Sequence, residues 1–153
     1  MILGPGAIAP DFTLANQFGQ PVSLADFRGV KPVTLVFFPL AFSRTCQGEL
    51  CELRDHPELF EDSGTELLGV SVDSKHALRA WAEEQGYGFQ LLADFWPHGE
   101  VARAYGAFNE ALGCANRVAV VIDKDGKVVD RFDTPDLKTP RTRERYEEAL
   151  KKL

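Results

Sequence analysis

The sequence predicts one α/β domain in which helices alternate with the strands of a largely buried sheet. Residues 32–38, 66–72 and 118–122 are short runs rich in apolar residues, a composition typical of strands that are covered on both faces. Segments with helical character follow the first two runs, so strands joined through a helix should be parallel neighbours. The chain has the length of one domain with one core, and we expect residues 1–153 to form it.

An N-terminal β-hairpin comes first in the expected order of elements. Residues 11–14 and 22–24 have the composition of strands, and a Gly-Gln-Pro turn at residues 19–21 joins them. The buried strand at residues 32–38 follows. It stops at Pro39, because proline has no backbone N–H to donate to a sheet.

Two helices are expected in the middle of the chain. Ser43 can cap a helix over residues 44–60, which Pro57 should kink or end. After the second buried strand, Asp73 or Ser74 caps another helix, which the next glycine stops. These helices supply the crossovers that parallel strands require.

A second β-hairpin and a helix complete the chain. The strand at residues 118–122 passes through an Asp-Lys-Asp-Gly-Lys turn into a strand over residues 127–132. Thr139, which precedes a proline, starts a C-terminal helix that runs to Leu153. Charges alternate in sign over residues 141–152, as expected for a solvated helix face. This order of elements is the thioredoxin-like pattern with an N-terminal β-hairpin extension.

The charge balance excludes several kinds of partner. Lys and Arg total 17 against 23 Asp and Glu, a net charge of −6, which argues against a broad nucleic-acid surface and against binding to anionic membranes. No apolar run approaches the roughly 20 residues that span a bilayer. Residues 1–10 lack the basic and apolar regions of a signal peptide, and we therefore expect a cytoplasmic protein.

Three cysteines, Cys46, Cys51 and Cys114, are too few for a disulfide scaffold, and an odd number cannot all pair within one chain. In a reducing cytosol such residues are structural, metal-binding or redox-active. The chain has neither Cys-x-x-Cys nor His-x-x-x-His spacing, and no glycine-rich phosphate loop. We expect no metal and no cofactor, which leaves redox chemistry as the main candidate.

Cys46 lies where a helix would activate it. If Ser43 is the N-cap, Cys46 is the third helical residue, close to backbone N–H groups that have no partner within the helix. The positive end of the helix dipole favours the thiolate there over the thiol. The Ser43 hydroxyl and the first-turn amides can also stabilise charge on a leaving oxygen.

Two charged residues could complete this site. Arg117 opens the third buried strand, and loops at strand ends gather around one crevice, so Arg117 could lie beside Cys46. Glu49, one helical turn after Cys46, could hold an arginine guanidinium in a bidentate grip. Arg44 lies next to the cap, and we expect it to point to solvent.

The motif Pro39-x-x-x-Ser43-x-x-Cys46 is similar to the active-site signature of the peroxiredoxins, with Ser at the position that is more often Thr. Four further segments resemble the alkyl hydroperoxide reductase E branch of that family, so the resemblance covers essentially the whole chain: residues 37–42, 91–99, 104–106 and 115–117.

The resemblance implies a peroxidase with Cys46 as the peroxidatic cysteine. It also implies that Pro39 shields the sulfur, that Ser43 hydrogen-bonds the peroxide and that Arg117 stabilises the thiolate and the transition state. The substrates would be hydrogen peroxide and alkyl hydroperoxides, and the product a sulfenic acid on Cys46, which a thiol must reduce. Thioredoxin, a mycoredoxin or other glutaredoxin-like protein, and a low-molecular-weight thiol are all candidate reductants. Members of the family commonly form homodimers next to the active site.

Cys51 departs from the pattern of that branch. Its spacing from Cys46 resembles the bacterioferritin-comigratory (PrxQ) type, whose resolving cysteine lies five residues on in the same helix. Helix geometry separates the two Cα atoms by about 8.6 Å, whereas a disulfide tolerates at most about 7 Å. A Cys46–Cys51 disulfide therefore requires this turn to unwind, and Gly48 weakens the helix there by about 1 kcal/mol relative to alanine. Cys114 is a rival resolving residue.

Other interpretations remain open at this point. Cys51 can instead be a buried helical thiol that faces the sheet, and Cys114 a small apolar residue in a loop. A thioredoxin-type exchanger would carry a cysteine at the position that Glu49 occupies. An alternative function is a peroxide-sensing or thiol–disulfide exchange domain without multiple-turnover peroxidase activity.

Overall fold

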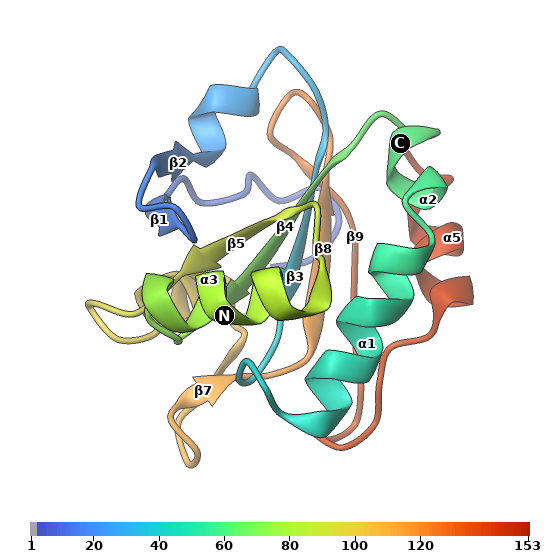
Figure 1. Cartoon of the computed structure of the whole chain (residues 1–153). Helices are drawn as coiled ribbons and strands as arrows, with labels where there is room; N and C mark the ends of the chain where they lie inside the picture. The colour runs from blue at the N-terminus through green and yellow to red at the C-terminus, as the bar shows by residue number, and fades with distance from the viewer. Residues whose placement is uncertain (1–2) are drawn as a thin grey trace.

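The computed structural model describes residues 3–153 (Figure 1). The elements in chain order are β1 (Thr13–Asn16), β2 (Pro21–Ser23), the 3₁₀ helix η1 (Leu24–Phe27), β3 (Val33–Phe37), α1 (Arg44–Asp55), α2 (Glu58–Glu61), β4 (Glu66–Ser71), α3 (Lys75–Gln85), β5 (Gln90–Ala93), α4 (Glu100–Ala104), β6 (Phe108–Asn109), β7 (Cys114–Ala115), β8 (Val118–Ile122), β9 (Val128–Asp133) and α5 (Arg143–Leu150).

Seven strands form the main sheet, in the order β2-β1-β5-β4-β3-β8-β9. The strands β3, β4 and β5 are parallel neighbours, as expected for strands joined through helices. The strand β8 runs antiparallel to β3 and pairs with β9 as a hairpin, and the N-terminal hairpin attaches antiparallel to β5. The short strands β6 and β7 pair separately. The α/β architecture and both hairpins were thus predicted correctly.

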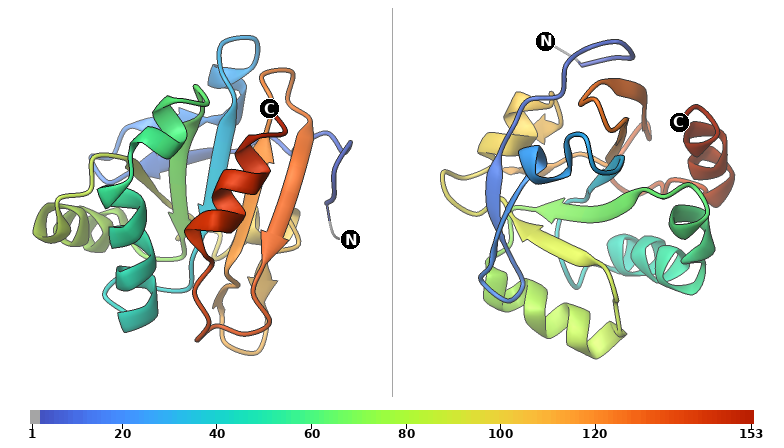
Figure 2. Two further views of the ribbon diagram at one scale, coloured as in Figure 1. Left: turned by 90° about the vertical axis from the view of Figure 1, so that its right-hand side faces the viewer. Right: turned by 90° about the horizontal axis from the view of Figure 1, so that it is seen from above.

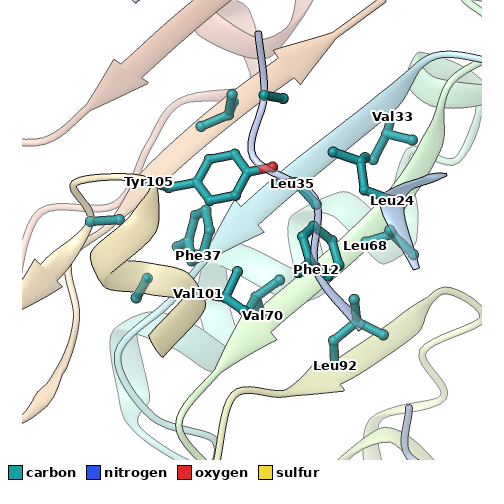
Figure 3. Packing of buried hydrophobic residues seen from close by; sticks show 14 of the residues in the cluster. Phe12, Leu24, Val33, Leu35, Phe37, Leu68, Val70, Leu92, Val101 and Tyr105 are labelled. Atoms are coloured by element: carbon teal, nitrogen blue, oxygen red, sulfur yellow. The ribbon is translucent and has the colours of Figure 1, made fainter. Parts of the chain in front are cut away.

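Both faces of the sheet are covered, and the pattern of β3 explains why. All five residues of β3 are buried, and Leu35 and Phe37 pack on one face while Val36 packs on the other. Figure 3 shows the first face, where the Tyr105 ring lies 5.5 Å from that of Phe37 and 6.3 Å from that of Phe12. The N-terminal segment, η1 and α4 cover this face, whereas α1, α2, α3 and α5 cover the opposite one (Figure 2).

The first long helix ends where proline interrupts it. It stops at Asp55, and Pro57 begins the short helix α2, as the sequence indicated. The helix α3 is capped by Ser74, whose hydroxyl accepts a hydrogen bond from the Ala77 N–H. Gly86 ends it in the left-handed conformation that glycine adopts without strain.

The expected start of the C-terminal helix was wrong. The N-cap of α5 is Thr142, whose side chain accepts from the Arg145 N–H, and the helix ends at Leu150. The hydroxyl of Thr139 instead bonds the carboxylate of Asp136, which also accepts two backbone N–H groups. These hydrogen bonds hold Thr139 in a local turn around the Asp136 side chain, so Thr139 does not join the helix.

The strand β5 and the helix α4 were not predicted at all. Each has five residues or fewer, so neither shows enough of a repeating apolar pattern to be recognised. Among the described residues 3–153, no helix has the length and apolar character needed to cross a membrane.

Candidate active site

The site lies at one edge of the sheet because of the strand directions. The parallel strands β3, β4 and β5 all end at this edge, and the antiparallel strand β8 begins there. The loop that follows β3 therefore meets the residue that precedes β8, although they are far apart in sequence. This geometry brings Cys46 and Arg117 together, as the sequence analysis predicted.

Cys46 is the third residue of α1 and is completely buried. The Arg117 Nη2 group donates a hydrogen bond to its sulfur at 3.1 Å. Arg44, in contrast, is exposed, as expected for a residue next to the cap. The sulfur thus lies at the N-terminus of a helix and in contact with a fixed positive charge, and both features favour the thiolate.

The guanidinium group of Arg117 is held by three different partners. Its Nε donates to the Leu137 carbonyl at 2.7 Å, its Nη1 to Glu49 Oε1 at 3.1 Å, and its Nη2 to Cys46. Arg117 is itself only 2% exposed. Because each nitrogen has its own acceptor, the group that faces the sulfur has a defined orientation.

Glu49 forms a bidentate ion pair with an arginine, but that arginine is Arg141 rather than Arg117. The Arg141 Nη2 lies 2.6 Å from Glu49 Oε1, and its Nε lies 3.0 Å from Oε2. The Arg141 backbone N–H also donates to Oε2, at 2.5 Å. Glu49 therefore bridges two guanidinium groups and contacts Arg117 through one oxygen only.

The charges in this buried cluster balance when Cys46 is ionised. Two guanidinium groups then face one carboxylate and one thiolate. Burial alone would raise the pKa of Glu49, but hydrogen bonds and the charges of Arg141 and Arg117 outweigh it and hold the pKa below its ordinary value of 4.5. Glu49 is thus an anion at neutral pH, and Arg141 offsets its charge so that Arg117 remains available to the sulfur.

Arg141 was missed by the sequence analysis, and its expected exposure was wrong. It belongs to the alternating charges that suggested a solvated face, yet its side chain is 0% exposed. No local pattern separates it from the partly exposed arginines nearby, Arg143 and Arg145. Arg141 lies just before α5, which packs on the sheet (Figure 2). Its burial follows from this tertiary packing and not from a local pattern.

The loop between β3 and α1 supplies Pro39 and Ser43. Pro39 is buried, and the Ser43 hydroxyl donates to the Leu40 carbonyl at 2.8 Å. Ser43 is the N-cap residue by position, but its side chain makes no capping hydrogen bond, contrary to the expected cap. Since its hydrogen is already donated, the Ser43 oxygen can serve a ligand as an acceptor.

This loop is held in an uncommon shape by Asp73. The Asp73 carboxylate accepts from the Ala41 N–H at 2.8 Å and from the Ser71 hydroxyl at 2.6 Å. Phe42, the next residue, has a φ of 66°, a left-handed conformation that costs a non-glycine residue about 1 kcal/mol. The sequence indicates only a possible helix cap at Asp73, but this residue follows β4 at the same sheet edge and anchors the loop.

The hydrogen-bonding partners of Cys51 are neutral groups. It is half-buried, and its sulfur lies 3.4 Å from Gln85 Oε1 and 3.5 Å from the Tyr87 hydroxyl. Burial and, secondarily, the contact with Cys51 raise the pKa of Tyr87 above its ordinary value, so the phenol keeps its proton. All three cysteines are free thiols.

Cys114 is buried in β7. Burial and, secondarily, the negative charge of Cys46 raise the pKa of the Cys114 thiol, which makes it a poor nucleophile at neutral pH. Within residues 3–153, no three His, Cys, Asp or Glu side chains gather as a metal ion would require. The contact between Arg117 and the Cys46 sulfur suits attack by a Cys46 thiolate on an electrophile.

Comparisons with known proteins agree with this chemistry. The AhpC/TSA family model matches residues 5–131. Alkyl hydroperoxide reductase E of Mycobacterium tuberculosis is 52% identical over 125 residues, which cover 82% of each chain. Peroxiredoxin Bcp of Escherichia coli is 34% identical over 143 residues, 90% of this chain and 88% of that protein.

Solved structures show the same likeness. The crystal structure of peroxidoxin BcpB from Mycobacterium tuberculosis matches with a TM-score of 0.86 and 28% identity over 97% of each chain. Enterococcus faecalis AhpC matches with a TM-score of 0.88 and 28% identity over 99% of this chain and 92% of that one. The predicted thioredoxin-like α/β fold is thereby confirmed.

Proposed function

The chain belongs to the AhpC/TSA family of peroxiredoxins and is a thiol-dependent peroxidase, and from this premise we propose that Cys46 is the residue that reduces the peroxide. One observation carries the assignment above all others. The Cys46 sulfur lies at the start of a helix, with the Arg117 guanidinium 3.1 Å away in a buried site. Both groups stabilise negative charge on the sulfur and on the peroxide oxygen that leaves when the O–O bond breaks.

The reaction that fits these groups is a displacement at oxygen. The Cys46 thiolate attacks the peroxide oxygen that carries hydrogen, and the O–O bond breaks. The second oxygen leaves as an alkoxide or hydroxide and takes up a proton to become an alcohol or water. The sulfur is oxidised to a sulfenic acid and the peroxide is reduced. Arg117 stabilises the charge that develops on the leaving oxygen.

Ser43 and Pro39 prepare the substrate for this attack. The Ser43 hydroxyl donates to the Leu40 carbonyl, so its oxygen is oriented to accept a hydrogen bond from the peroxide. Pro39 is buried beside the site and has no N–H to offer water, so it shields the sulfur. Asp73 positions this loop through Ala41.

Cys51 resolves the sulfenic acid. Its sulfur attacks Cys46, a disulfide forms, and the sulfenic oxygen leaves as water. The two residues lie five positions apart on one helix, and the turn between them must unwind for their sulfurs to meet. The relation to Bcp-type peroxiredoxins and the poor nucleophilicity of Cys114 support this choice.

The names of the relatives suggest the substrates. We propose that the protein, acting as a single domain, reduces alkyl hydroperoxides and hydrogen peroxide in the cytoplasm, and that a thiol regenerates it. The reductant is thioredoxin, a glutaredoxin-like mycoredoxin or a low-molecular-weight thiol. We also propose a homodimer, because exposed apolar side chains flank the site: Leu40, Phe42, Phe95 and Trp96.

The test is multiple-turnover peroxide consumption with a thiol reductant. Cys46→Ser should abolish turnover, whereas Cys114→Ser, the matched control, should retain it. After one equivalent of peroxide, mass mapping should find a Cys46–Cys51 disulfide in the wild type and in Cys114→Ser, and a Cys46 sulfenic acid in Cys51→Ser. Retained turnover in Cys46→Ser would contradict the assignment of Cys46, and a disulfide that uses Cys114 would contradict that of Cys51.

A further inference from the structure

The turn of α1 that must unwind for resolution contains one of the most strongly held side chains in the protein. Glu49 follows Cys46 by three residues and precedes Cys51 by two, so it belongs to the segment between the two sulfurs. Its two carboxylate oxygens accept four hydrogen bonds, one from Arg117 and three from Arg141. Unwinding of this turn displaces the Glu49 backbone and pulls its carboxylate away from these donors.

We propose that the Glu49–Arg141 ion pair is a latch that keeps α1 wound between the two cysteines. Arg141 is then a positioning residue that controls how the Cys46 sulfenic acid divides between disulfide formation and over-oxidation. This inference rests on the proposed function, in which Cys51 resolves Cys46.

The latch is strong because the Arg141 side chain depends on one carboxylate. Its side chain is 0% exposed, and within residues 3–153 all of its side-chain hydrogen bonds go to Glu49. Its third nitrogen, Nη1, is buried without a partner among those residues. If Glu49 leaves, the buried guanidinium of Arg141 loses the carboxylate that accepts all of its side-chain hydrogen bonds, which is unfavourable.

Two other polar contacts of the same turn oppose unwinding less than this pair does. Arg117 keeps the Leu137 carbonyl as a partner when Glu49 moves away. The Cys51 sulfur contacts only neutral groups of Gln85 and Tyr87, at 3.4 and 3.5 Å, and hydrogen bonds to sulfur are weak. Burial of Leu50 and the hydrogen bond from Trp81 Nε1 to Gln47 Oε1 at 3.2 Å also hold this turn. The Glu49–Arg141 pair adds a buried ion pair with three hydrogen bonds, and it joins the turn to a residue far away in the sequence.

The latch acts on a competition between two reactions of the sulfenic acid. In one, the Cys51 thiol displaces the oxygen as water and forms the disulfide, at a rate that depends on unwinding but not on peroxide. In the other, the sulfenic sulfur attacks a second peroxide, which is reduced to an alcohol or water while the sulfur becomes a sulfinic acid. A tighter latch slows the first reaction, so less peroxide is needed for over-oxidation.

Arg141→Lys tests the latch because lysine keeps the charge but cannot hold both oxygens of Glu49. Loss of one charge-assisted hydrogen bond should speed formation of the Cys46–Cys51 disulfide about tenfold in a single turnover. The peroxide concentration that converts half of Cys46 to sulfinic acid should rise by a similar factor. Arg145→Lys is the matched control, since Arg145 pairs with Asp130 of β9 and its variant should keep the wild-type rate.

Hydrogen exchange separates a latch from general loss of stability. In Arg141→Lys, the amides of residues 46–52 should exchange faster while those of β3 and β8 keep their protection; faster exchange throughout the core would overturn the latch. If Arg141→Lys does not fold, Glu49→Gln weakens the same pair from the other side and should also speed disulfide formation.

The possible failures are distinguishable. An unchanged rate of disulfide formation in the folded variant overturns the latch and leaves the resolving role of Cys51 intact. Absence of the disulfide in both the wild type and the variant overturns that role, and the latch with it. Absence of any oxidation of Cys46 by peroxide overturns the proposed function itself.

Discussion

The two cysteines of α1 lie five residues apart, yet their surroundings differ completely. Cys46, in the first turn, is fully buried and accepts a hydrogen bond from a guanidinium group. Cys51, one and a half turns later, is half-buried and contacts an amide and a phenol. The helix provides the first cysteine with favourable backbone dipoles, but its charged partner, Arg117, comes from the residue before β8. Reactivity is thus assigned by tertiary contacts as much as by position in the helix.

Cys114 sharpens this contrast, because it shows that burial alone does not activate a thiol. It is buried like Cys46, but burial raises its pKa. Arg117 donates a hydrogen bond to the sulfur of Cys46. Three variants separate the contribution of charge from that of the helix to the difference between Cys46 and Cys51.

The largest effect is expected when Arg117 is replaced by methionine. Loss of the guanidinium group should lower the second-order rate constant for oxidation of Cys46 by about 10²–10³-fold, because the developing charge loses its main stabilising donor. Arg44→Met is the matched control. Arg44 is exposed and lies in the same turn of α1 as Cys46, so its removal should leave the rate within about twofold. Stopped-flow oxidation kinetics distinguish the two. Equal rates in both variants would mean that helix position alone activates Cys46.

A smaller but substantial effect on stability is expected for Glu49→Gln. Removal of the buried carboxylate should lower the free energy of unfolding at pH 7 by about 3 kcal/mol, because two guanidinium groups lose their counter-charge. The pKa of Glu49 in the folded protein is below its ordinary value of 4.5, so its ionised form stabilises the fold above that pH. This contribution disappears as the pH falls through the folded-state pKa.

Urea unfolding at pH 7 and at pH 3 measures this dependence. The difference between the wild type and Glu49→Gln should shrink at the lower pH. Glu52→Gln, three residues along the same helix and half exposed, is the control and should change stability by no more than about 0.5 kcal/mol at either pH. A Glu49→Gln difference that is the same at both pH values would show that charge does not account for the stability of this turn.

The smallest effect is expected for Gly48→Ala, which acts on the helix and not on its charges. A Cβ at this position meets no atom within 4 Å, so alanine fits without strain. Alanine favours the helix by about 1 kcal/mol and should slow formation of the Cys46–Cys51 disulfide about fivefold. The rate at which peroxide oxidises Cys46 should stay the same in this variant. An unchanged rate of disulfide formation would argue that the turn does not unwind.

The parts of the fold that were predicted correctly have strong local signals. The strand β3 is an uninterrupted apolar run bounded by two prolines, and Pro57 separates α1 from α2 by its chemistry alone. The strand β5 and the helix α4 were missed because both are too short to show a period. The predicted start of α5 was wrong because the Asp136 side chain accepts hydrogen bonds from the backbone N–H groups of Lys138 and Thr139, which holds this segment in a turn.

Some residues of the candidate site can likewise be predicted from the sequence, whereas others cannot. Cys46 and Ser43 follow from the strand-to-helix turn, and the proximity of Arg117 follows from the antiparallel strand that it opens. The roles of Asp73 and Arg141 do not follow from sequence. Each depends on a hydrogen bond to a residue more than 30 positions away, Ala41 in one case and Glu49 in the other.

By itself, the sequence determined the α/β class, the helix that begins just before Cys46, and the peroxiredoxin character of the chain. These features depend on short-range backbone preferences and on a contiguous motif. Only the tertiary structure decided which arginine Glu49 grips and which cysteine meets a guanidinium group. Burial makes a charged group depend on its few partners, and those partners are chosen by how β8 and the segment before α5 pack against α1.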